Sequence, residues 1–108
     1  MNEYLPALYQ RIRRRFPDIV ETHEAFAGAC YDVGPLDPST RHLVKLGIAI
    51  GASRQGAVAS HVRQALEAGA TPEEIEHAAL LAAPTVGFPA AAAALSWIEE
   101  VFEARRSD

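Results

Sequence analysis

The stretch Gly69-Ala70-Thr71-Pro72-Glu73-Glu74 separates two predicted helices and indicates the fold more clearly than any other part of the sequence. Gly69 can end the first helix, because glycine readily adopts the left-handed conformation found at helix C-termini. Thr71, Pro72 and Glu74 have the spacing of a capping box, in which threonine and glutamate side chains each accept a backbone N–H of the other residue. The stretch therefore predicts a helix, a tight joint and a second helix.

Earlier in the chain, Asp37 and Pro38 supply an N-cap and a first-turn proline for another helix. This helix continues through a run that is apolar on nearly every side: Leu43, Val44, Leu46, Ile48 and Ile50. We expect it to be the central helix, surrounded by protein. A break at Gly51-Ala52-Ser53 leads to the next helix, which begins near Arg54.

Prolines divide the rest of the chain. Pro17 interrupts the first helix after Phe16, Pro84 ends or kinks the fifth, and Pro89 opens the last. In the second helix, one face carries Ile19, His23, Phe26, Ala27 and Cys30, which predicts that Cys30 is a core residue.

These signals divide the chain into about six helices with short joints, and no segment alternates as a strand would. The 108 residues are 49% hydrophobic and 22% charged, which is typical of a globular domain. We predict an all-α fold, a compact six-helix-type bundle over residues 1–108 as a single domain. A chain this short can cover an exposed apolar face with a second copy of itself.

Charge and composition argue against several classes of partner. The net charge of -4 disfavours nucleic acid, and the basic cluster of Arg11, Arg13, Arg14 and Arg15 is typical of a solvated helix face. The N-terminus lacks the continuous apolar region of a signal peptide, and no window reaches membrane-spanning length. We therefore expect a cytoplasmic protein without a nucleic-acid or membrane partner.

The sequence contains few of the residues and motifs that usually bind cofactors or metals. Cys30 is the only cysteine, so one chain can form neither an internal disulfide nor a two-thiol redox centre. The four histidines, at positions 23, 42, 61 and 77, show no clustered pair, and there is no glycine-rich phosphate loop. We expect no metal and no cofactor.

The candidate site is a stripe on the helix that begins near Arg54. Helical spacing places Arg54, Ala57 and His61 along one edge of its apolar face, and His42 can meet this stripe if the neighbouring helices pack antiparallel. Arginine provides a planar fork for a carboxylate, and a neutral histidine can accept or relay a proton. We predict His61 and His42 as catalytic residues and Arg54 as the binding residue for a small carboxylated substrate. The alternative is that these histidines are packed core residues without a catalytic role.

Three segments carry a resemblance to a known family: Leu36 to Val44, Ala57 to His61, and Ala65 to Ile75 with its Gly-Ala-Thr-Pro-Glu-Glu. Together with Gly87-Phe88-Pro89, they resemble the carboxymuconolactone decarboxylase and alkylhydroperoxidase D superfamily. The resemblance covers most of the chain. It implies an all-helical protein that assembles into homotrimers or homohexamers, with a cofactor-free active site near the histidine helix.

The redox branch of this superfamily has Cys-x-x-Cys with a histidine four residues later, and a relay glutamate on the preceding helix. Here Arg54 and Ala57 stand at the two cysteine positions and His42 at the glutamate position, so only His61 is retained. A peroxidase of that type needs a thiolate and a resolving thiol, which this chain lacks.

The function that the resemblance favours is that of a cofactor-free lyase or isomerase, a carboxy-lyase acting on a small carboxylated compound of the kind found in aromatic-acid breakdown. One alternative is a divergent alkylhydroperoxidase-like antioxidant protein that uses Cys30 alone. The other is a non-catalytic binding or assembly module on the same scaffold.

Overall fold

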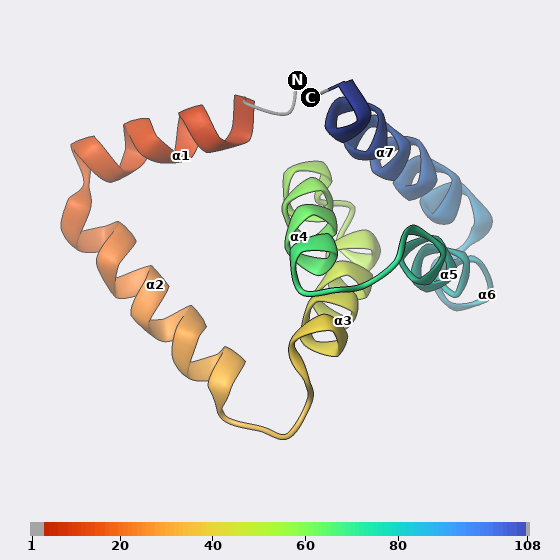
Figure 1. The fold of residues 1–108 in the computed structure, drawn as a ribbon, viewed down its shortest axis with the longest axis horizontal. Coiled ribbons are helices and arrows are strands. Elements are labelled where there is room, and N and C mark those ends of the chain that lie inside the picture. The colour runs from red at the N-terminus through yellow and green to blue at the C-terminus, as the bar shows by residue number, and fades with distance from the viewer. Residues whose placement is uncertain (1–3, 108) are drawn as a thin grey trace. The chain divides into compact units, whose positions relative to one another are not determined.

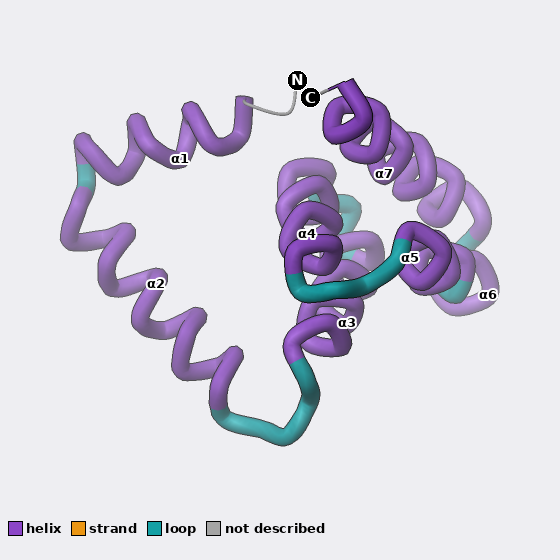
Figure 2. Tube along the Cα trace, viewed as in Figure 1, coloured by secondary structure: helices purple, strands orange, loops and turns teal. Residues whose placement is uncertain are grey.

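The computed structural model describes residues 4–107, which fold into two compact units that divide between Leu36 and Asp37. The described residues form seven helices and no strand. Figure 2 shows the helices in purple and the loops that join them in teal. The prediction of an all-α fold is confirmed, whereas the single domain over residues 1–108 stays a prediction. Within residues 4–107, no helix is both long and apolar enough to span a membrane.

The first unit contains α1 (Tyr4–Arg15) and α2 (Pro17–Asp32), with Pro17 as the first residue of the second helix. A polar cluster joins the two helices: the Tyr9 hydroxyl donates to the Glu24 carboxylate, which also forms an ion pair with Arg13. The other three arginines of the basic cluster are exposed, as a solvated helix face requires.

The predicted inner face of α2 is exposed in the structure. Ile19 and Phe26 are 68% and 70% exposed, and Cys30 is exposed as well, so the prediction of Cys30 as a core residue is wrong. The spacing of apolar residues does define a helix face, but it contains no information on whether the same chain covers that face.

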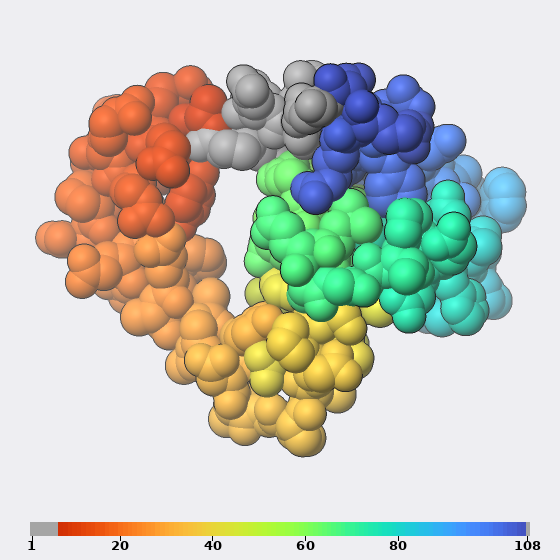
Figure 3. Space-filling view, in the orientation of Figure 1, coloured from red at the N-terminus to blue at the C-terminus, as the bar shows by residue number. Residues whose placement is uncertain are grey.

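The second unit contains α3 (Pro38–Gly51), α4 (Gln55–Glu67), α5 (Pro72–Leu80), α6 (Ala82–Val86) and α7 (Phe88–Ser107). In Figure 1, α4 lies beside α3, and α7 runs past α5 and α6; in Figure 3 these helices form one continuous body. Aliphatic side chains from α3, α4, α5 and α7 fill its core, the largest being Leu46, Ile50, Ile75, Ile98, Val58 and Val62.

The helix starts of this unit follow the local sequence. The Asp37 carboxylate accepts the backbone N–H of Thr40 at 2.9 Å. Thr71 and Glu74 form the complete capping box, with hydrogen bonds of 2.9 and 3.1 Å. Gly69 has a φ of 102°, the left-handed conformation predicted for the end of the preceding helix.

Pro84 explains why there are seven described helices instead of six. The predicted fifth helix ends at Leu80, and the short α6 then begins at Ala82, so that Pro84 lies in its first turn. A proline is tolerated there because the N–H groups of a first turn have no partner within the helix. Gly87, with a φ of 117°, then turns the chain into α7.

The prediction that α3 is surrounded by protein is only half correct. Its inner face is buried, but Val44 and Ile48 on the other side are 46% and 66% exposed. An apolar run does not distinguish burial within one chain from an apolar surface left open.

Candidate functional site

The two histidines predicted to be catalytic lie next to each other. His42 is in the second turn of α3 and His61 is in the middle of α4, and their ring centroids are 6.1 Å apart with the planes tilted by 32°. His42 is 7% exposed and His61 is partly buried. The short joint between α3 and α4 makes the helices run antiparallel, which brings these positions together.

Burial keeps both imidazoles uncharged near neutral pH. Desolvation is the main reason that the pKa of His61 falls to about 4, and the positive charge of Lys45 and the neighbouring His42 lower it further. Desolvation, followed by the charges of Lys45 and Arg41, also lowers the pKa of His42, while Glu67 acts in the opposite direction. The site thus contains two neutral imidazoles side by side.

One nitrogen of His61 lacks a hydrogen-bond partner among the described residues. The Nδ1 atom is buried and forms no hydrogen bond with any residue in the part of the chain that the structure describes. A buried polar atom without a partner costs free energy, which a bound molecule can recover by hydrogen bonding to it. In residues 4–107, no three His, Cys, Asp or Glu side chains gather as metal ligands would.

The third predicted site residue, Arg54, lies at the joint between the helices. It is the exposed N-cap of α4, and its side chain makes no hydrogen bond or ion pair with any described residue. His61 follows seven residues later, about 10 Å along the helix axis. The structure therefore brings His42 and His61 together but leaves Arg54 near the opposite end of the hairpin from His42.

A cation that the sequence reasoning missed lies closer to the imidazoles. Lys45 is partly buried, and its charge acts on both His42 and His61. Its spacing of three residues from His42 on a predicted helix was the signal that could have identified it, since such residues are neighbours on one helix face.

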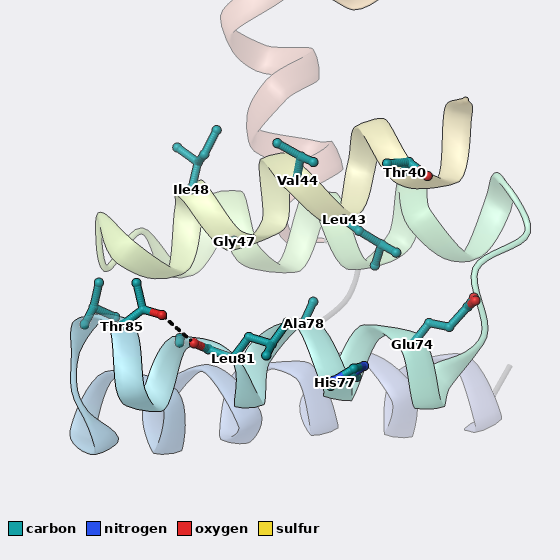
Figure 4. Close-up of a pocket in the computed structure, with 12 residues that line it drawn as sticks. Thr40, Leu43, Val44, Gly47, Ile48, Glu74, His77, Ala78, Leu81 and Thr85 are labelled. Atoms are coloured by element: carbon teal, nitrogen blue, oxygen red, sulfur yellow. Dashed lines mark hydrogen bonds between the residues drawn. The ribbon is translucent and has the colours of Figure 1, made fainter. Parts of the chain in front are cut away.

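An apolar groove of about 660 Å³ lies elsewhere in the second unit, between α3 and the pair α5 and α6 (Figure 4). Leu43, Val44 and Ile48 line it from α3, while Glu74 and His77 lie at its polar end. Each helical residue adds about 100° of rotation, so these α3 positions face away from His42. The groove and the histidine pair are therefore separate features.

The thiol is in the first unit, on α2. Its exposure removes burial as an objection to oxidation of Cys30. The other objection remains, because Cys30 is the only cysteine and a chain without a second one cannot form an internal disulfide.

The protein resembles solved structures, including the following two. One is a carboxymuconolactone decarboxylase family protein from Legionella pneumophila in its apo form, with a TM-score of 0.82, 22% identity, and coverage of 94% of this chain and 91% of that one. The other is a protein from Thermotoga maritima, with a TM-score of 0.75, 23% identity, and coverage of 98% and 96%. At these identities the likeness establishes the all-α fold. No curated protein matches the sequence significantly.

The family of the protein is established by its sequence. The profile of the carboxymuconolactone decarboxylase family matches residues 17–100, which include α2, all of α3 to α6 and most of α7. This range contains His42, His61 and the capping box of α5. The chain belongs to the carboxymuconolactone decarboxylase family.

Proposed function

We propose that the protein is a cofactor-free lyase or isomerase, of the carboxy-lyase type, that acts on a small carboxylated compound at the His42 and His61 pair. The observation that carries the proposal is the contact between two imidazoles with lowered pKa values, one of which has a buried nitrogen without a partner. Perturbed titratable groups gathered in this way are typical of sites that move protons.

The chemistry uses the imidazoles as proton carriers. In a decarboxylation, the bond between the substrate carbon and its carboxylate breaks, carbon dioxide leaves, and the electron pair remains as a dienolate. An imidazole N–H hydrogen bonds to the developing oxyanion. An imidazole then takes a proton from water and delivers it to carbon, and the hydroxide that remains is released with the carbon dioxide. In an isomerisation, the same imidazole removes a proton from one carbon and returns it to another.

Substrate binding would favour this transfer. The pKa of about 4 keeps His61 neutral in the free protein, and a carboxylate placed beside it raises that pKa again, because an anion stabilises the imidazolium. The bound site can therefore protonate more readily than the empty one. In this proposal Arg54 binds a part of the substrate that extends toward the joint between α3 and α4.

Assembly is the second part of the proposal. The exposed apolar side chains of α2 and α3 give the chain surfaces that a homotrimer or homohexamer can cover. We place the protein in the cytoplasm, with no nucleic acid or membrane as partner.

The proposal is tested by turnover. The protein is incubated with a panel of small unsaturated carboxylates and carboxylated lactones, and released carbon dioxide and ultraviolet absorbance are followed. We expect one member to be converted, with the rate lost in His61→Gln and retained in His77→Gln, which changes an exposed histidine in the groove. Conversion that survives in His61→Gln would reject the site.

The groove favours a second candidate, a non-catalytic binding or assembly module. It has a volume of about 660 Å³, and neither His42 nor His61 lines it. Under this alternative no panel member is converted, and substitutions that fill the groove, such as Gly47→Leu, change the assembly of the protein while His61→Gln does not.

A third candidate function is that of an antioxidant protein that uses a single thiol. It is compatible with the structure because Cys30 is exposed and can meet peroxide. Mass spectrometry after treatment with peroxide distinguishes it: oxidation to the sulfenic acid at a rate far above that of a free thiol supports this candidate, and an ordinary rate removes it.

A further inference from the structure

We propose that Lys45 is the residue that binds the substrate carboxylate beside His42 and His61. This inference rests on the proposed function and gives its site an anchoring cation that no sequence pattern identified. Lys45 is the only lysine in the chain.

The geometry of the helical hairpin places Lys45 level with His61. Lys45 lies six residues before the last residue of α3, and His61 lies six residues after the first residue of α4. Both are therefore about 9 Å from the joint along antiparallel helices. His42 lies one turn beyond Lys45 on the same face of α3, so the ammonium group and the two imidazoles form one cluster.

The charge of Lys45 is not neutralised by a neighbour. No hydrogen bond or ion pair joins its ammonium group to a carboxylate among the described residues. A partly buried cation beside two neutral imidazoles attracts an anion, since the low dielectric surroundings strengthen the interaction while the imidazoles add hydrogen bonds. Glu67, the acidic residue that acts on His42, is exposed and lies further along α4.

Arg54 does not fit this role as well. It lies at the joint and is exposed, about 10 Å along α4 from His61. An anion held by Arg54 alone would not lie against the imidazoles. A carboxylate held by Lys45 is in contact with them, which directs the site toward small carboxylates whose reacting carbon is close to the anionic group.

The test is a titration of the histidine side chains by NMR in the wild type, Lys45→Met, Lys45→Arg and Arg105→Met, where the last variant removes one exposed positive charge that is not among those acting on His61 or His42. Without any ligand, we expect the pKa of His61 to rise in Lys45→Met and to stay unchanged in Arg105→Met. An unchanged pKa in Lys45→Met would show that Lys45 is not adjacent, which overturns the inference. The thermal midpoint of each variant reports whether it is folded.

The second arm adds benzoate and acetate as probes. We expect benzoate to shift the His61 resonances, with an apparent Kd about tenfold or more weaker in Lys45→Met, largely restored in Lys45→Arg, and less affected in Arg54→Met. Equal binding by the wild type and Lys45→Met would overturn the role of Lys45 but leave the histidine site standing. Failure of both probes to shift His61 even in the wild type would contradict the inference and also count against the carboxylate site as a whole.

Discussion

At the scale of single residues, the chemistry depends on imidazoles that remain neutral. A protonated histidine next to Lys45 would repel a second positive charge, whereas a neutral one can accept a proton and donate a hydrogen bond at the same time. Burial of His42 and His61 on facing helices keeps them in this state.

The depressed pKa of His61 also makes stability depend on pH. His61 has its ordinary pKa of 6.5 in the unfolded chain and a pKa of about 4 in the folded chain. Between these two pH values the unfolded state therefore binds more protons than the folded state. Stability therefore falls as the pH is lowered from 6.5 to 4. After a discount for partial exposure, we expect His61→Gln to abolish about 2 kcal/mol of this loss in urea unfolding. A pH dependence identical to that of the wild type would contradict the lowered pKa.

The position of a side chain could be predicted where helical spacing determines it. Its burial could not, because burial depends on which other parts of the protein cover it. The meeting of His42 with His61 followed from helical spacing and the short joint. Lys45 could not be identified as a site residue, although its spacing of three residues from His42 was visible, because helical spacing does not reveal that a side chain is partly buried beside His61. The burial of Cys30 was predicted wrongly, because an apolar helix face does not reveal what covers it.

At the scale of elements, the capping box of α5 makes a separate contribution to stability. We expect Thr71→Ala to lower the free energy of unfolding by about 1 kcal/mol, because it removes the acceptor for the backbone N–H of Glu74. Ser96→Ala is the control, since Ser96 is exposed within α7. Equal stability of Thr71→Ala and the control would show that water replaces the cap without cost.

Two glycines of the second unit should respond in opposite directions. Gly69→Ala places a side chain at a φ of 102° and should destabilise the protein by about 1 kcal/mol or more. Gly47→Ala lies inside α3, where a methyl group meets nothing within 4 Å, and should stabilise by about 0.5 to 1 kcal/mol. Chemical denaturation measures both, and effects of equal sign would contradict the assigned conformations.

Most helix ends were predictable because caps, prolines and glycines act over three or four residues. The starts of α3 and α5 and the end of α4 follow such local signals. The division of the predicted fifth helix into α5 and α6 could be predicted only in part. Pro84 is compatible either with a kink in one helix or with the first turn of a new helix, and the structure has the second. The open side of α3 could not be read from its apolar run.

At the scale of the whole molecule, the open apolar surfaces predict self-association. Phe26 on α2 and Ile48 on α3 are 70% and 66% exposed, and such surfaces usually mark interfaces. We expect light scattering after size exclusion to give the mass of a trimer or hexamer. A protein that stays monomeric at high concentration would contradict this expectation.

The whole-molecule fold class could be predicted because the helical pattern continues through the chain and the family resemblance covers most of it. The identity of the substrate and the exact number of subunits could not be predicted, because both depend on groups outside the chain. The histidine pair and the groove lie on opposite sides of α3. Neither the spacing of residues nor the composition of the sequence indicates which of the two binds a ligand.

The most direct test of the histidine site is thermal unfolding of the wild type, His61→Gln and His77→Gln in the presence of small carboxylates and lactones. A ligand that binds only the folded state raises the midpoint. The site predicts that at least one carboxylate stabilises the wild type and His77→Gln but not His61→Gln. A carboxylate that stabilises all three proteins equally, or none that stabilises the wild type, would contradict it.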